Sequence, residues 1–351
     1  MKEYKLAEFL KAYDTILFDM DGVITSEQAY WDSAALTVYE MLYSSQYYGD
    51  KVLDAKNAED NLSKIRKDIF CSDRTIRLVK DKGVNSNWDL AYVVLSAALI
   101  SEKELSFEDV YKKIDSSGKD AFEIYDTLAE LLSVKFKKEK AYFERLSTFW
   151  QEVTNCFQEW YLGDINYKNT YSSLPRLSDK SGFMSAEKPL VDHDKLICLL
   201  KLLKSDNKRL GVGTGRLRAE SEPVLINWGA REFFDDDALI TYNDVTSSEE
   251  ELAACGLNVN LTKPHPFMFL KGHFGNEISA IDIVNENYDK ESLNRTLVIG
   301  DAGADLFSAR AGGFSFAAVL TGVQGQDART FFEKENATFI LNDVLELMVE
   351  K

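Results

Sequence analysis

The sequence predicts an α/β protein with a parallel sheet, helices on both faces of that sheet, and a large, mainly helical insertion. After about residue 189, short apolar runs alternate with helical patterns, which is typical of a parallel sheet with crossover helices. The run "TILFD" at residues 15–19 has the same character, although it lies near the start of the chain. Between these regions, residues 27–162 contain three glycines and no proline, which favours helix.

The predicted strands are apolar throughout, as expected for strands covered on both faces. They are residues 15–19, 209–214, 238–243, 296–301, 314–322 and 338–341. Residues 193–204 and 304–312 have helical patterns between them. Within the insertion, residues 120–132 are predicted to form a helix with Asp120 as N-cap. Its apolar side chains recur at helical spacing: Phe122, Tyr125, Leu128 and Leu132. Residues 1–14 are predicted to form a short amphipathic helix.

The first apolar run and the later ones are assigned to one sheet because they share one character. The chain is therefore expected to divide into an α/β core of residues 1–26 and 189–351 and a helical domain of residues 27–188. Residues 171–188 are loop-like and are expected to form the hinge by which the chain returns to the sheet. Most tryptophans of the insertion are expected in its core: Trp31, Trp88, Trp150 and Trp160.

The composition excludes several classes of partner. The 351 residues include 58 acidic and 41 basic side chains, for a net charge of -17. Repulsion then disfavours nucleic acid and anionic membrane surfaces, but not a small phosphate ester or a cation. The N-terminal residues contain no signal-like apolar core, and no run is long enough to cross a bilayer, so a cytoplasmic protein is expected. The four scattered cysteines predict buried thiols rather than disulfides or a zinc site.

Polar side chains follow three of the predicted strands at their carboxyl ends, where open parallel sheets bind ligands. Asp19 and Asp21 follow the first strand, one residue apart and therefore on the same side. Thr214 ends the second, and Asp301 ends "TLVIGD", with Asp305 one helical turn later. Clustered carboxylates repel one another unless a cation lies among them, and few carboxylates with open positions suit Mg²⁺ beside a phosphate.

Lys263 lies between these strands in the proline-braced loop "LTKPHP". A lysine and a threonine hydroxyl can hold the oxygens of a phosphoryl group that do not contact the metal. An aspartate can act as the nucleophile that forms an aspartyl-phosphate, and a second carboxyl can act as general acid and then base. These residue types together predict phosphoryl transfer.

The chain resembles the haloacid dehalogenase (HAD) superfamily, in its Mg²⁺-dependent phosphatase branch with a helical cap after the first strand. Four motifs carry the resemblance in family order: "DMDGV", Thr214 in "VGTGR", Lys263 in "KPHP", and "GDAGADLFSARAGG". It covers the sheet region, about half of the chain, whereas the insertion is similar only in position and helical character. The resemblance implies a Rossmann-like core and specificity that resides in the cap.

The resemblance also implies a role for each motif residue. Asp19 is the nucleophile and Asp21 the general acid and base. Thr214, with Gly215 beside it, and Lys263 bind the phosphoryl group. Mg²⁺ is held by the carboxylates of Asp19 and Asp301 and the backbone carbonyl of Asp21, while Asp305 binds it through water or pairs with Lys263.

Other interpretations of these motifs are weaker. "DMDG" resembles part of a calcium loop but lacks the later ligands, and "GVGTGR" has the wrong glycine spacing for a dinucleotide site. Arg216 is either a contact to substrate or, more simply, part of a surface ion pair. In the insertion, Asn87 and Trp88 stand at the start of a predicted helix, where an N-capped helix with a buried tryptophan competes with substrate contact.

The sequence therefore predicts a Mg²⁺-dependent phosphomonoester hydrolase that acts on a small phosphorylated metabolite. A phosphomutase is the nearest alternative, and a binding or regulatory protein that retains the site is another. Asp21 argues against a dehalogenase, because attack on a carbon–halogen bond requires no proton for the leaving group.

Overall fold

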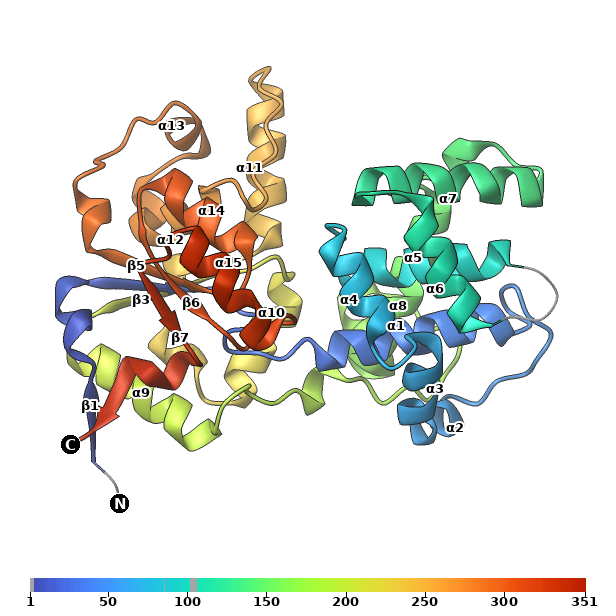
Figure 1. The fold of residues 1–351 in the computed structure, drawn as a ribbon, viewed down its shortest axis with the longest axis horizontal. Coiled ribbons are helices and arrows are strands. Elements are labelled where there is room, and N and C mark those ends of the chain that lie inside the picture. Colours follow the sequence, from blue (N-terminus) through green and yellow to red (C-terminus); the bar gives the residue numbers. More distant parts are fainter. Residues whose placement is uncertain (1–2, 85, 102–105) are drawn as a thin grey trace. The chain divides into compact units, whose positions relative to one another are not determined.

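The computed structural model describes residues 3–84, 86–101 and 106–351, which form two compact units (Figure 1). Unit 1 consists of Met1–Glu27 and Glu187–Lys351, and unit 2 of Gln28–Ala186. The chain leaves unit 1 after its first sheet strand and returns before the second. Unit 2 is therefore an insertion between two neighbouring strands.

Unit 1 contains a parallel sheet of six strands within the described residues, in the order β4-β3-β2-β5-β6-β7. The strands are β2 (Thr15–Phe18), β3 (Arg209–Gly213), β4 (Leu239–Ile240), β5 (Thr296–Gly300), β6 (Ser315–Val319) and β7 (Phe339–Leu341). Each overlaps a predicted strand, which confirms the α/β class. The strand predicted at 238–243 is shorter because Thr241 caps a helix that begins at Tyr242.

Helices lie on both sides of the sheet (Figure 1). They are α9 (His193–Ser205), α10 (Arg218–Asn227), α11 (Tyr242–Ala254), α12 (Phe267–Phe274), α13 (Ala280–Val284), α14 (Gly303–Gly312) and α15 (Arg329–Lys334). α12 packs against β2 and β3, and α14 packs against β5 and β6. Their apolar side chains join Leu17, Val298 and Phe316 in one buried cluster. The intervening strand residues point to the opposite face, and α9 also packs against β3.

The predicted N-terminal helix is wrong. Tyr4–Leu6 forms β1, which pairs antiparallel with β8 (Met348–Glu350), and Glu8–Ala12 forms a short 3₁₀ helix. The pairing joins residues near the two ends of the given sequence, so no local sequence pattern predicts it.

Unit 2 is helical around α5, a helix that is buried on every side from Asp89 to Leu99. Its helices are α1 (Gln28–Tyr43), α2 (Ala55–Asp60), α3 (Leu62–Ile69), α4 (Arg74–Asp81), α5 (Asn87–Ile100), α6 (Phe107–Ser117), α7 (Ala121–Phe136) and α8 (Thr148–Tyr171). α1 packs against α3, α5 and α8. Asp120 caps α7 as predicted, accepting a hydrogen bond from the backbone N–H of Glu123.

Some side chains of unit 2 differ from expectation. Leu128 and Leu132 of the predicted apolar stripe of α7 are buried, but Phe122 is 82% exposed and Ile124 is buried in addition. Trp150 and Trp160 are buried, whereas Trp31 and Trp88 are half-buried. The cysteines are free thiols, but only Cys71 and Cys156 are buried; Cys198 is half-buried and Cys255 is exposed. Among the described residues, no helix combines the length and apolarity that crossing a membrane requires.

A group of buried charges lies within unit 2, and we call it the Lys180 cluster: Lys180, Glu40, Glu159 and Cys156. The Lys180 Nζ atom is 2.9 Å from Glu40 Oε2 and 2.5 Å from Glu159 Oε2. The Cys156 thiol donates to Glu40 Oε2 at 3.5 Å. Burial raises the pKa of Glu159, although Lys180 opposes this rise. The ammonium group thus holds the segment after α8 against α1 and α8.

Candidate active site

The carboxyl ends of three adjacent strands position the first site residues. Asp19 follows β2, Thr214 follows β3, and Asp301 follows β5, and these strands are neighbours in the sheet. The backbone N–H of Asp19 donates to Ile299 O at 2.8 Å, and that of Thr214 donates to Ile240 O at 2.9 Å. The sheet therefore fixes the backbone from which each of these side chains projects.

Lys263 joins two of the acids. Its Nζ atom is 2.6 Å from Asp19 Oδ1 and 2.7 Å from Asp305 Oδ1. Burial alone would lower the pKa of Lys263, but the charges of Asp19 and Asp305 outweigh burial and raise it above its ordinary value. The lysine is thus a fixed positive charge at the end of the sheet.

Three carboxylates gather around this lysine. Asp19, Asp301 and Asp305 each offer an oxygen, and these oxygens all lie within 4.8 Å of one another. Burial raises the pKa of Asp19 to about 7, against the opposing effect of Lys263. Burial, followed by the charges of Asp305 and Asp19, raises the pKa of Asp301 well above its ordinary value. One ammonium does not balance the buried carboxylates of Asp19 and Asp305 together with the half-buried one of Asp301, so the site suits a further cation.

The backbone around Asp301 leaves room for its carboxylate only because two glycines face it. A Cβ on Gly22 would lie 2.2 Å from Asp301 Oδ2, and one on Gly322 would lie 1.9 Å from the same atom. Gly22 also has a φ of +75°, which side chains disfavour. Three hard oxygen donors in this cradle fit the preferences of Mg²⁺. A second acidic group, Glu40, Cys156 and Glu159, differs because only two carboxylates and a thiol surround its ammonium, that of Lys180.

Asp305 has two contacts at the start of α14. Its Oδ2 atom accepts from the backbone N–H of Ala302 at 3.3 Å, while Oδ1 faces Lys263. The residue is therefore both a helix-capping acid and a partner of the lysine.

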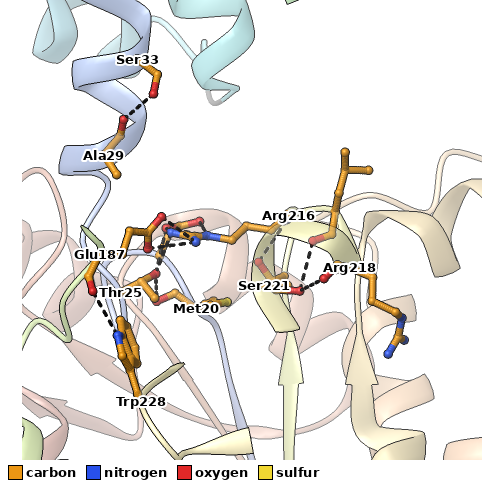
Figure 2. Close-up of polar contacts among 12 residues, drawn as sticks. Met20, Thr25, Ala29, Ser33, Glu187, Arg216, Arg218, Ser221 and Trp228 are labelled. Carbon is orange, nitrogen blue, oxygen red and sulfur yellow. Dashed lines mark hydrogen bonds and ion pairs between the residues drawn. The ribbon is translucent and has the colours of Figure 1, made fainter. Parts of the chain in front are cut away.

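Asp21 binds to a different part of the structure. Its carboxylate accepts hydrogen bonds from the Arg216 guanidinium, the shortest from Nη2 to Oδ1 at 2.6 Å, and from Thr25 Oγ1 at 2.9 Å. Arg216 also pairs with Glu187 (Figure 2). The predicted surface ion pair of Arg216 exists, but it is buried, with 3% of the residue exposed.

Thr214 and Gly215 form the turn that leads to Arg216. Thr214 is buried, and its Oγ1 atom accepts the backbone N–H of Arg216 at 3.1 Å. A hydroxyl that accepts in this way still has its own proton to donate. Gly215 is exposed, and no atom lies within 4 Å of where its Cβ would be.

Asn87 and Trp88 lie in unit 2, at the first turn of α5, whereas the other predicted site residues lie in unit 1. Ser86 caps this helix by accepting the backbone N–H of Asp89. The Trp88 ring meets the Trp150 ring edge-on at 6.0 Å between centroids. These contacts account for the polar start of the helix and for the tryptophan.

Sequence reasoning missed Thr25 and Glu187. Thr25 lies three residues before unit 2 begins and Glu187 directly follows it, and both contact Arg216 through their side chains. Each contact spans 29 residues or more, so local spacing could not reveal either. The position of both residues at the edges of the predicted insertion is the one signal that could have drawn attention to them.

Comparison with known proteins places this geometry in context. A family model described as HAD-hydrolase-like matches residues 260–347. An X-ray structure solved by the Northeast Structural Genomics Consortium shares 27% identity with this chain at a TM-score of 0.81, over 95% of this chain and 97% of that chain. A phosphatase from Thermococcus thioreducens shares 18% identity with a TM-score of 0.49, over 91% and 98% of the two chains. No curated protein matches the sequence.

Proposed function

Because the chain belongs to the haloacid dehalogenase-like hydrolases, we propose that it hydrolyses phosphomonoesters through an aspartyl-phosphate on Asp19. The main support is the contact between Asp19 and Lys263, with Asp301 and Asp305 beside them at the end of the sheet. A lysine on one oxygen of Asp19 favours its anionic form and orients the other oxygen for attack.

The reaction has two steps. Asp19 attacks phosphorus, the bond from phosphorus to the ester oxygen breaks, and Asp21 gives its proton to the departing alkoxide. Asp21 then takes a proton from water, whose oxygen attacks phosphorus. The bond to Asp19 breaks and inorganic phosphate is released.

The remaining side chains neutralise and orient the phosphoryl group. Lys263 and the Thr214 hydroxyl supply donors to its oxygens, and the backbone N–H groups after Asp19 add to them. Asp19, Asp301, Asp305 and the carbonyl of Asp21 are the groups that would hold Mg²⁺. When bound, this ion supplies positive charge to the transferring phosphoryl group.

We assign unit 2 the role of a cap that excludes water and selects the substrate. The segments that lead into and out of it support this role, because they pair with each other within unit 1 close to Asp21. Thr25 and Pro189 form an isolated β-bridge, and the backbone N–H of Leu190 donates to Ile24 O at 2.9 Å. A change in the position of either segment would therefore also change the surroundings of Asp21, the proposed general acid.

The test is phosphate release from a panel of metabolite phosphates with Mg²⁺, compared with the same assay in excess chelator. Asp19→Asn removes the nucleophile with almost no change in volume, so it should reduce every activity to background. The exposed Asp68, paired with Lys64 on α3, provides a matched control as Asp68→Asn, which should retain activity. Full turnover by Asp19→Asn, or in chelator, would overturn the proposal. Transfer of phosphate back to substrate rather than to water would identify a phosphomutase.

A further inference from the structure

All three nitrogens of the Arg216 guanidinium contact protein carboxylates. Nε lies 3.2 and 3.0 Å from the two carboxylate oxygens of Asp21, and Nη2 lies 2.6 Å from Oδ1 of the same residue. Nη2 also donates to Thr25 Oγ1 at 3.1 Å. Nη1 donates to both carboxylate oxygens of Glu187 at 3.1 Å. Figure 2 shows this arrangement, with Arg216 reaching toward Thr25 and Glu187.

The charges of this group depend on one another. The side chains of Arg216 and Glu187 are each 2% exposed, so neither has water to stabilise its charge. The Asp21 side chain is 26% exposed and forms the outward end of the group. Removing one member of a buried ion pair leaves the other charge without compensation. This costs far more free energy than removing one member of an exposed pair. Glu187 therefore keeps the guanidinium fixed, and the guanidinium fixes Asp21.

The backbone at Glu187 is anchored independently. Trp228 Nε1 donates to Glu187 O at 3.1 Å (Figure 2). The bridge between Thr25 and Pro189 lies two residues further on. Arg216 is itself positioned by its backbone N–H on Thr214. The guanidinium thus bridges two segments whose backbones are already held within unit 1.

We infer that Arg216 is a positioning residue that sets the orientation of the Asp21 carboxylate, and that Glu187 in turn holds Arg216 in place. This inference rests on the proposed function. A carboxylate that accepts hydrogen bonds from the guanidinium at both oxygens cannot rotate, whereas a carboxylate bound by threonine alone can. A lysine in place of Arg216 keeps the charge but presents no planar fork, so it cannot hold both carboxylates in the same geometry. Arg216 therefore affects proton transfer to the leaving group but not the attack by Asp19.

The test compares Arg216→Lys and Glu187→Gln with the parent in single-turnover formation of the aspartyl-phosphate. For an alkyl phosphate, whose leaving group needs a proton, Arg216→Lys should slow formation by about tenfold to 10²-fold, the size typical of a misplaced catalytic group. Glu187→Gln should have a smaller effect in the same direction. Nitrophenyl phosphate, whose leaving group needs no proton, should change little. Arg218→Lys is the matched control, because Arg218 pairs with Asp244 instead.

A second comparison separates positioning from general damage to the fold. In an Asp21→Asn background, Arg216→Lys should have no further effect on the alkyl substrate, since it acts only through Asp21. Equal losses for both substrates, or additive losses in the double variant, would overturn the inference while leaving the proposed function intact. If the parent forms no aspartyl-phosphate with either substrate, the proposed function itself fails. Thermal unfolding of each variant verifies that it is folded.

Discussion

Replacing Lys180 by methionine should destabilise unit 2 strongly, because the ammonium compensates two buried glutamates. The side chains of Lys180 and Glu40 are fully buried, and that of Glu159 is 4% exposed. Methionine fills most of the lysine volume, so the change removes the charge without leaving a large cavity. Breaking a buried ion pair by removing one partner typically costs about 3–5 kcal/mol.

The protonation equilibrium gives the same magnitude. Without Lys180, one glutamate would escape its charge by binding a proton. At pH 7, about 2.7 units above the ordinary pKa of glutamate, this protonation costs about 3.7 kcal/mol. At pH 5 the same step costs only about 1 kcal/mol. The glutamate pKa is raised in the folded variant above its unfolded value, so the lost stability grows as the pH rises from 5 to 7.

Urea unfolding followed by tryptophan fluorescence suits this measurement, because four of the five tryptophans lie in unit 2 and Trp160 is 4.8 Å from the Lys180 ammonium. The exposed Lys64, paired with Asp68, provides the control: Lys64→Met should change the free energy of unfolding by less than about 1 kcal/mol. The reasoning is refuted if Lys180→Met behaves like Lys64→Met at pH 7, or if its cost is the same at pH 5 and pH 7.

The remaining predictions concern the site and the helices. Mg²⁺ should raise the thermal unfolding midpoint more near pH 8 than near pH 5. Burial raises the pKa of Asp19 to about 7, so its ionisation destabilises the cation-free protein as the pH rises through 7, and cation binding offsets this destabilisation. Equal shifts of the midpoint at both pH values would contradict this prediction. Gly322→Ala should displace the Asp301 carboxylate and weaken this Mg²⁺ effect while far-UV circular dichroism stays unchanged; an undiminished effect would count against the crowding. Asp120→Ala should cost about 1 kcal/mol in urea unfolding by removing the cap of α7, and no loss would show the cap to be unimportant. Excising residues 30–170 with a short linker should reduce discrimination among substrates more than it disturbs the sheet, measured by relative kcat/KM values; an unchanged substrate ranking would argue against a specificity role for unit 2.

The sheet was predictable because its strands are buried on both faces and thus appear as uninterrupted apolar runs. β2, for example, is buried at each of its four positions. The pairing of β1 with β8 was not predictable, because Leu6, Phe9 and Leu10 fit a helical period locally and the strand partner of Leu6, Met348, lies more than 300 residues away. The exposure of Phe122 has a similar origin: two apolar faces compete in α7, and packing against α5 selects the one with Ile124.

The acids of the site were predictable because parallel strands bring their carboxyl ends to one edge, so Asp19 and Asp301 had to approach each other. The environment of Asp21 was not predictable, because it depends on the direction taken by the Arg216 side chain and on Glu187, which is distant in sequence. A buried guanidinium produces no periodic pattern in the sequence, so only the tertiary structure shows which carboxylates it binds.

The insertion of unit 2 between β2 and β3 also determines the sequence of events during synthesis on the ribosome. β2 leaves the exit tunnel about 190 residues before β3, which at roughly 5–20 residues per second is a delay of about 10–40 s. Its other neighbour, β5, emerges later still. Helical domains with local contacts fold in far less time than this, within about milliseconds. The helical unit therefore becomes compact first, while β2, which leads to Asp19, still has no strand partners. We expect β2 to be the segment of the nascent chain that most needs a chaperone.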